Sequence, residues 1–226
     1  CACAGIIIGS VFVSGLGLKF TQSVIDLSGG MLFPLLCLTA ISAIILGMGM
    51  TTTAVYITVA ALIVPSLIQA GVTPIAAHMF AFYFGVVSTI TPPVALASFA
   101  GAAIAKSPPM ATAVESSKVG IAKYIVPFAF IYNPALLMEG SYWISLYSLL
   151  SVLLAYWSMT LGLEGYLNKP LNVYTRIIAF ISSILLLLPP LSIFYGISGF
   201  LLNGVGFVIL IFVYLIQGKF KLGHVK

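Results

Sequence analysis

The sequence predicts an all-α integral membrane protein, and three observations support this prediction. Of the 226 residues, 62% are hydrophobic and only 6% are charged, whereas about a quarter of the residues in an ordinary soluble domain are charged. The mean hydropathy of +1.22 agrees, because a water-facing surface of this size needs many more charges. Apolar stretches also recur along the whole chain at lengths near the roughly 20 residues that cross a bilayer. We therefore expect lipid to be the main solvent.

Eight apolar segments are candidates for membrane helices. They cover residues 1–17, 31–48, 54–69, 75–105, 119–138, 142–162, 173–189 and 193–216. The last four are each near full length, with Pro127, Pro134 and the Pro189-Pro190 pair marking kinks or ends. The first segment starts within apolar sequence, so we expect a C-terminal piece of a longer protein. Cys1, Cys3 and Cys37 are expected to be small packing residues, since they form no metal-ligand set.

The basic residues predict the orientation, because Lys and Arg accumulate in short cytoplasmic loops. The residues concerned are Lys106, Lys118 and Lys123 around one loop, Lys169 and Arg176 around another, and Lys219, Lys221 and Lys226 in the tail. All three places share one face if the segment 75–105 crosses once and the later helices alternate. A cytoplasmic C-terminus follows, with Lys19, Asp26 and Glu139 outside.

The stretch GMGMTTTAVY, residues 47–56, joins two apolar arms of 18 and 16 residues. Gly47 and Gly49, followed by Thr51, Thr52 and Thr53, are poor helix material. Because each arm is short for a full crossing, we predict a re-entrant helical hairpin over residues 31–69 with this sequence at its tip. At a tip, backbone carbonyls are tolerated at membrane depth only inside protein or beside water. The alternative is two ordinary spans that pack closely through small residues.

A second unusual stretch, STITPPV at residues 88–94, interrupts the segment 75–105. Pro92 and Pro93 lack amide donors, and Thr91 before them is disfavoured in helical geometry. We predict a broken transmembrane helix whose first half, about residues 75–90, ends in free carbonyls and whose second half begins near residue 94 with free amides. Transporters hold ions and substrates at such breaks. The alternative is a proline kink whose hydroxyls are bonded locally.

Residues 27–105 contain no Asp, Glu, Lys or Arg. The one candidate for a proton relay there is His78, which lies about 20 Å from Pro92 along a helix at 1.5 Å per residue. We interpret His78 as a polar packing residue. A cation site would then consist of neutral carbonyl and hydroxyl oxygens, which suits a hard ion such as Na⁺. The hydroxyls available are those of Thr51, Thr52, Thr53, Ser88 and Thr91.

Four motifs occur in order at compatible spacings: the Gly-Met-Gly tip, the AH-F-FYF pattern at residues 77–84, TPPVALA at residues 91–97 and YNPALL at residues 132–137. In these the sequence resembles the TRAP (tripartite ATP-independent periplasmic) transporters, closest to the type in which the small and large membrane subunits are fused. The resemblance covers roughly residues 1–138, the C-terminal repeat of the large subunit. Residues 139–226 resemble only the additional C-terminal transmembrane helices of such fusions. Thr51 stands where the family usually has proline.

The resemblance implies an elevator-type carrier with two inverted repeats, each with a hairpin and a broken helix. Sodium sites lie where a hairpin tip meets a break, and the substrate lies between them. By matching position, the tip residues are Gly47, Gly49, Thr52 and Thr53, and the break residues are Ser88, Thr91, Pro92 and Pro93. The implied partners are a periplasmic substrate-binding protein, the first inverted repeat and the small-subunit helices, in the inner membrane. No nucleic acid is expected, nor a cofactor beyond Na⁺ as coupling ion.

Three functions remain open from sequence. The first is a Na⁺-driven carrier that imports organic acids. The second is an ion channel, whose filter can also use Gly and Thr carbonyls, and the third is a structural membrane subunit that transports nothing. An enzyme is not expected, because the chain has no GxSxG, HExxH or paired carboxylates. The substrate is not indicated, since no Lys or Arg is expected near the break to pair with a carboxylate.

Overall fold

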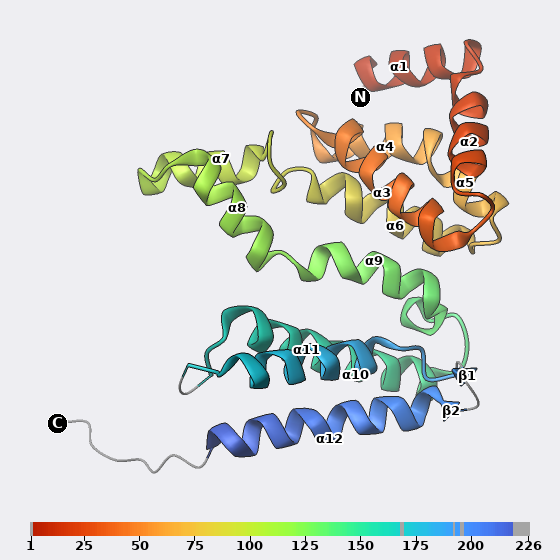
Figure 1. Cartoon of the computed structure of the whole chain (residues 1–226). Coiled ribbons are helices and arrows are strands. Elements are labelled where there is room, and N and C mark those ends of the chain that lie inside the picture. The colour runs from red at the N-terminus through yellow and green to blue at the C-terminus, as the bar shows by residue number, and fades with distance from the viewer. Residues whose placement is uncertain (1, 168–169, 192, 195–196, 219–226) are drawn as a thin grey trace. The chain divides into compact units, whose positions relative to one another are not determined.

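The computed structural model describes residues 2–167, 170–191, 193–194 and 197–218, and almost all of its regular structure is helical (Figure 1). The chain divides into two units, residues 1–131 and residues 132–226. Cys1, Lys169 and the tail from Lys219, with the predicted cytoplasmic C-terminus, lie outside the described residues. The mostly helical architecture agrees with the predicted fold class.

The first unit begins with two short helices, where the sequence predicted one truncated span over residues 1–17. Helix α1 (Ala2–Val13) and helix α2 (Leu16–Leu27) are separated by Ser14 and Gly15. Gly15 has φ +66°, a left-handed conformation that glycine adopts at little cost. This turn redirects the chain, which hydropathy alone does not reveal because both sides of it are apolar.

The next three helices form a helical hairpin. Helix α3 (Leu32–Gly47) and helix α4 (Thr52–Leu62) are joined by residues 48–51, and the short helix α5 (Val64–Gln69) follows. The second arm is divided because Pro65 lacks an amide donor and sits in the first turn of α5. Both arms pack on helix α6 (Pro74–Val87), and the buried side chains of these helices include Leu36, Val55 and Phe80. Whether the hairpin dips into the membrane and returns stays a prediction.

The helix after the hairpin is broken. Helix α6 ends at Val87 and helix α7 (Leu96–Ala105) begins nine residues later, so the interruption is wider than residues 90–94. The Pro92-Pro93 peptide bond within it is cis. Helix α6 ends before the prolines, and the hydroxyl residues that follow bond to its last carbonyls, as described below.

Residues 106–118, predicted as a loop, are mostly helical. Helix α8 (Pro109–Val119) starts with a proline at its first turn, a favoured position, and packs against α7. Charge counting could not separate a polar helix from a loop, since both expose lysine. Helix α9 (Ala122–Tyr132) and the 3₁₀ helix η1 (Pro134–Leu137) then replace the single predicted span 119–138. The helical geometry is interrupted at Asn133 because the residue before a proline is disfavoured in a helix.

In the second unit, three long helices pack through small side chains. They are α10 (Tyr142–Glu164), α11 (Val173–Leu187) and α12 (Gly199–Gly218). Ser151 Oγ donates to the Leu186 carbonyl (2.6 Å) and Ser158 Oγ to the Ala179 carbonyl (2.8 Å), so α10 and α11 share two buried hydrogen bonds. Ser182 Oγ donates in the same way to Gly206 of α12 (2.7 Å). Such bonds and small residues are typical of helix packing in lipid.

Two helix ends in this unit are capped by a side chain of the following helix. Arg176, in the first turn of α11, donates from Nε to the Gly162 carbonyl (2.8 Å) and from Nη2 to the Leu163 carbonyl (2.7 Å) at the end of α10. Asn203 of α12 is 1% exposed. With its amide nitrogen turned toward α11, it donates to the Leu185 carbonyl (2.7 Å) and the Leu188 carbonyl (3.2 Å). These bonds add donors at helix ends, where the last carbonyls have no partner within the helix.

The last predicted span, 193–216, also begins later than expected. Residues Ile193–Phe194 (β1) pair antiparallel with Ile197–Ser198 (β2), and α12 starts at Gly199. The apolar run continues through these residues, so hydropathy did not mark the boundary. By length and composition, α10 is the one helix in the described part of the chain that could span a membrane, beside shorter apolar helices of 10–17 residues.

Candidate functional site

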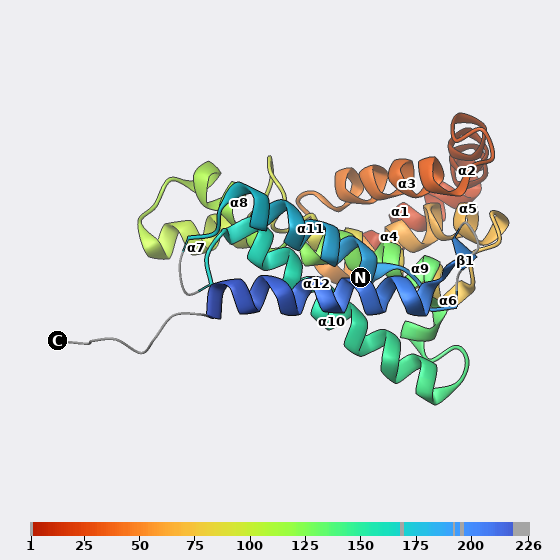
Figure 2. The ribbon, with the colours of Figure 1, turned by 60° about the horizontal axis from the view of Figure 1, so that its bottom comes forward.

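The hairpin and the helix break meet at Gly47 and Ser88. A Cβ atom placed on Gly47 would lie 2.5 Å from Ser88 Oγ, 2.9 Å from Ser88 Cβ and 3.0 Å from the Gly85 carbonyl oxygen. Both residues are buried. In Figure 1 and in the turned view of Figure 2, the turn after α3 lies beside the loop between α6 and α7. Only glycine allows this approach, because any other side chain would displace the tip or the break.

The other tip residues lie outside this contact. Gly49 has φ +82° and is exposed, so the turn at residues 48–51 depends on its left-handed backbone. Thr51, Thr52 and Thr53 are all exposed at the start of α4, and Thr51 makes no side-chain hydrogen bond that caps this helix. The structure therefore brings Gly47 to the break and leaves the three threonine hydroxyls on the surface of the hairpin.

Three hydroxyls after α6 bond back to its last turn. Ser88 Oγ donates to the Gly85 carbonyl (2.6 Å), Thr89 Oγ1 to the Val86 carbonyl (2.8 Å) and Thr91 Oγ1 to the Val87 carbonyl (2.8 Å). The prediction that α6 ends in free carbonyls is therefore wrong for this turn. The sequence offered a broken helix and locally bonded hydroxyls as alternatives. The structure has both, since α6 and α7 are separate helices and the hydroxyls bond back to α6.

This bonding pattern determines what the hydroxyls can bind. A hydroxyl group has one proton and two oxygen lone pairs. When the proton points back to a helix carbonyl, the lone pairs are left to accept hydrogen bonds or to contact a cation. The break therefore presents electron-rich oxygens of Ser88, Thr89 and Thr91 without any formal charge.

The backbone of the break is also bonded. The Thr89 carbonyl accepts from the Ala97 amide (3.0 Å), which connects the break to the first turn of α7. Ser117 Oγ of α8 lies 3.0 Å from the Ile90 carbonyl oxygen and 3.0 Å from the Ala113 carbonyl oxygen of its own helix, so its one proton is shared between them. Ser98, in the first turn of α7, is 5% exposed and its hydroxyl has no hydrogen-bond partner. Pro92 and Pro93, which have no amide donor, are accommodated between these bonds.

Sequence reasoning missed several residues around the break. Thr89 lies within the STITPPV motif and could have been found as a third hydroxyl. Ser117 and Tyr124 could not, since they follow the break by about 30 residues and reach it only because α8 and α9 fold back. Tyr124 OH lies 2.6 Å from Thr91 Oγ1. Ser98 is indicated by no motif.

The charges and the histidine near the site are also informative. Lys118 lines an open pocket together with Pro92 and Tyr124, so the inference that no basic residue lies near the break is wrong. Its Nζ pairs with exposed Glu115 at 2.7 Å. His78 Nδ1 lies 3.0 Å from Tyr56 OH of α4, as suits a polar packing residue. The described residues contain no cluster of three His, Cys, Asp or Glu that could hold a metal ion.

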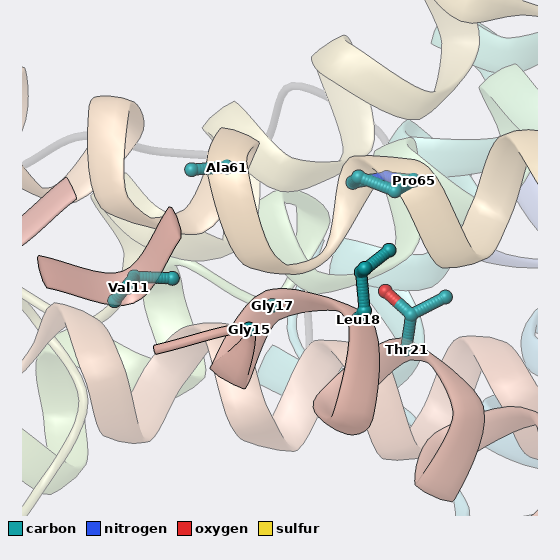
Figure 3. Close-up of a pocket in the computed structure, with 7 residues that line it drawn as sticks. All are labelled: Val11, Gly15, Gly17, Leu18, Thr21, Ala61 and Pro65. Carbon is teal, nitrogen blue, oxygen red and sulfur yellow. The ribbon is translucent and has the colours of Figure 1, made fainter. Parts of the chain in front are cut away.

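A separate cavity of about 190 Å³ lies between the first helices and the hairpin (Figure 3). Its lining residues are Val11, Gly15, Gly17, Leu18, Thr21, Ala61 and Pro65. The walls are almost entirely apolar, and the Thr21 hydroxyl is buried without a partner. The cavity shares no lining residue with the tip or the break, so it is not part of the candidate site.

A family model described as "Tripartite ATP-independent periplasmic transporter, DctM component" matches residues 1–142. The chain belongs to this family. DctM proteins are permease components of TRAP transporters in the inner membrane, and they work with a periplasmic binding protein and a small DctQ subunit. This TRAP permease chain is therefore a transport protein.

No curated protein and no solved structure matches this DctM chain. The family match contains the hairpin, the broken helix and η1, and it ends at the first residue of α10. The three-helix bundle of the second unit lies almost wholly beyond it. The tip and the break are thus both in the part of the chain that the family defines.

Proposed function

We propose that this TRAP permease chain is part of a Na⁺-coupled carrier that imports organic acids delivered by a periplasmic binding protein. The observation that carries the proposal is the close approach of Gly47 to Ser88, which joins the hairpin tip to the helix break. In an elevator-type carrier of two inverted repeats, this junction is one of two related ion sites. The first repeat and the small-subunit helices complete the substrate site.

The proposed sodium site consists of neutral oxygens. Its residues are Gly47, Gly49, Thr51, Thr52 and Thr53 of the tip, Ser88 and Thr91 of the break, and Pro92 and Pro93, which shape the break. We add Thr89, because its hydroxyl proton is also directed to α6. Na⁺ is a hard cation that favours oxygen ligands. Without a carboxylate the affinity should be modest, so uptake should depend on sodium in the millimolar range.

The test replaces Thr52 and Thr91 separately by valine in the complete transporter with its binding protein present. Each variant keeps the side-chain shape and loses one candidate ligand. A loss of about 1 kcal/mol, the scale of one hydrogen bond, corresponds to a roughly five-fold higher sodium concentration for half-maximal uptake. The matched control is Thr160→Val in α10, because Thr160 also bonds back to a carbonyl four residues earlier (Tyr156, 2.9 Å).

The same assay separates the other functions. Sodium dependence that is unchanged in both variants would mean that these hydroxyls are not ligands. Uptake that follows a proton gradient without sodium would mean that the coupling ion is wrong, and His78 would be the residue to examine. Uptake that does not saturate with substrate would favour a channel, and uptake that is insensitive to the tip altogether would favour a structural subunit.

A further inference from the structure

The helix break is held from a second side by α8 and α9. Ser117 Oγ of α8 lies 3.0 Å from the Ile90 carbonyl oxygen, and Tyr124 OH of α9 lies 2.6 Å from Thr91 Oγ1. Between them, a Cβ atom on Gly120 would lie 2.6 Å from Ile90 Cδ1. Thus α8 and α9 contact two consecutive residues of the break, at the point where Pro92 and Pro93 interrupt backbone hydrogen bonding.

Counting protons shows which group donates in each bond. Thr91 has one hydroxyl proton, and the Val87 carbonyl receives it at 2.8 Å. The proton between Thr91 and Tyr124 therefore comes from the tyrosine. Thr91 Oγ1 then has one lone pair in that bond and one lone pair free. Ser117 Oγ also has one proton, and two carbonyl oxygens lie 3.0 Å from it, those of Ile90 in the break and of Ala113 in α8. The Ile90 carbonyl oxygen therefore receives a shared hydrogen bond and keeps a second lone pair.

We propose that Tyr124 and Ser117 are positioning residues for the coupling ion, which hold the oxygens of Thr91 and Ile90 in the orientation that binds it. Neither residue contacts the ion. The inference rests on the proposed function, and it adds Ile90 as a backbone ligand. Gly120 permits this arrangement because it lets α8 and α9 approach the break closely.

The bonds from α8 and α9 should raise ion affinity because they reduce the conformational entropy that the ligand oxygens lose when the ion binds. In a helix, an amide of the next turn fixes each carbonyl, but residues 90–93 lie outside any helix and two of them are prolines, which have no amide proton. Without the bonds from α8 and α9, the Thr91 side chain and the Ile90 peptide can adopt several orientations. Ion binding must then fix one of them, which lowers affinity. Loosely held oxygens also discriminate less between ions of different radius, since a rigid site resists a change in ligand distance.

The experiment is sodium-dependent uptake by the complete transporter in proteoliposomes, with its binding protein present. The variants are Tyr124→Phe and Ser117→Ala, and lithium replaces sodium in a second series. We expect Tyr124→Phe to raise the half-saturating sodium concentration about three- to ten-fold, the range of one hydrogen bond. Ser117→Ala should raise it less, because the Ser117 proton is shared with the Ala113 carbonyl. The maximal rate at saturating sodium and the substrate KM measured there should not change. The ratio of lithium- to sodium-supported uptake should rise.

The matched control is Tyr83→Phe, because the Tyr83 ring packs edge-on against Phe130 with centroids 5.5 Å apart and lies in the same unit. The proposal is overturned if Tyr124→Phe and Ser117→Ala change the sodium requirement no more than this control. It is also overturned if they lower the maximal rate alone, since that pattern indicates a purely structural role. Wild-type uptake that needs no sodium would instead overturn the proposed function itself.

Discussion

Gly47 is the residue on which the contact between hairpin and break depends. Its α carbon faces Ser88 with no room for a methyl group, whereas a Cβ on Gly101 of α7 would meet no atom within 4 Å. Both glycines lie in helices, where alanine is otherwise favoured by about 1 kcal/mol. The two positions therefore separate the effect of space from the effect of helix propensity.

We predict that Gly47→Ala impairs transport while Gly101→Ala does not. The new methyl group must move the tip or the break by several tenths of an ångström, which disturbs any ion site shared by both. Sodium-dependent uptake should fall at least ten-fold in Gly47→Ala and stay near the wild-type rate in Gly101→Ala. Equal uptake by the two single alanine variants would exclude a tight junction.

The residues of the site differ in how far the sequence could reveal them. Gly47 and the Pro92-Pro93 pair were predicted, because glycine and proline affect the backbone wherever they occur. The exposure of Thr51, Thr52 and Thr53 was not, since a motif gives residue types without directions. Tyr124 and Ser117 have no local signal at all, because their roles arise from a tertiary contact between segments about 30 residues apart.

At the scale of helices, α4 and α6 pack so closely at Gly85 that there is no room for a side chain at this position. A Cβ on Gly85 would lie 2.7 Å from Val55 Cγ1, and Val55 is fully buried. We predict that Gly85→Ala destabilises the protein by about 1–3 kcal/mol, the usual cost of overpacking. Thermal unfolding of the purified transporter in detergent measures it. In the double variant with Val55→Ala, the two costs should be clearly less than additive; strict additivity would mean that the helices are not in contact here.

The cap on α10 supplies a second prediction for a helix. Arg176→Met keeps the aliphatic stem and removes both donors to the Gly162 and Leu163 carbonyls. We expect a loss of stability on the order of 1.5 kcal/mol, reduced from the sum of two charged hydrogen bonds because Arg176 is partly exposed. Arg176→Lys should recover only part of it, since an ammonium group lacks the planar fork. The control is exposed Lys123→Met, and an equal loss there would show that charge alone matters.

Whether a segment is helical was easier to predict than the residues at which its helix begins and ends. The long apolar segments are helices, as their composition required, and the hairpin arms and α10 begin and end within a few residues of the predicted bounds. The turn at Gly15, the helix α8 and the late start of α12 were not predicted. At Gly15 and before α12, hydropathy stays nearly constant although the backbone changes direction. At α8, the polar sequence fits a loop and a polar helix equally well.

For the whole molecule, we predict the orientation from its basic residues. Ala111 in α8 and Ser141 before α10 are both exposed, so cysteine at either position is open to labelling. In a background without native cysteines, an impermeant maleimide added to intact cells should modify position 141 and not position 111. Permeabilised cells should show modification of both. The reverse pattern in intact cells would invert the topology and place Glu139 in the cytoplasm.

The capping of α10 by Arg176 and of α11 by Asn203 has a consequence for how the protein is made. The ribosome synthesises α10 before α11 and α11 before α12, so each cap is completed only after the helix it serves has left the ribosome. Backbone carbonyls withheld from water without partners cost free energy. The C-terminal end of each helix is therefore stabilised by the helix that follows it in the chain, so the bundle becomes more stable step by step from α10 to α12. A nascent chain stopped before residue 203 would lack the amide that donates to the Leu185 and Leu188 carbonyls at the end of α11.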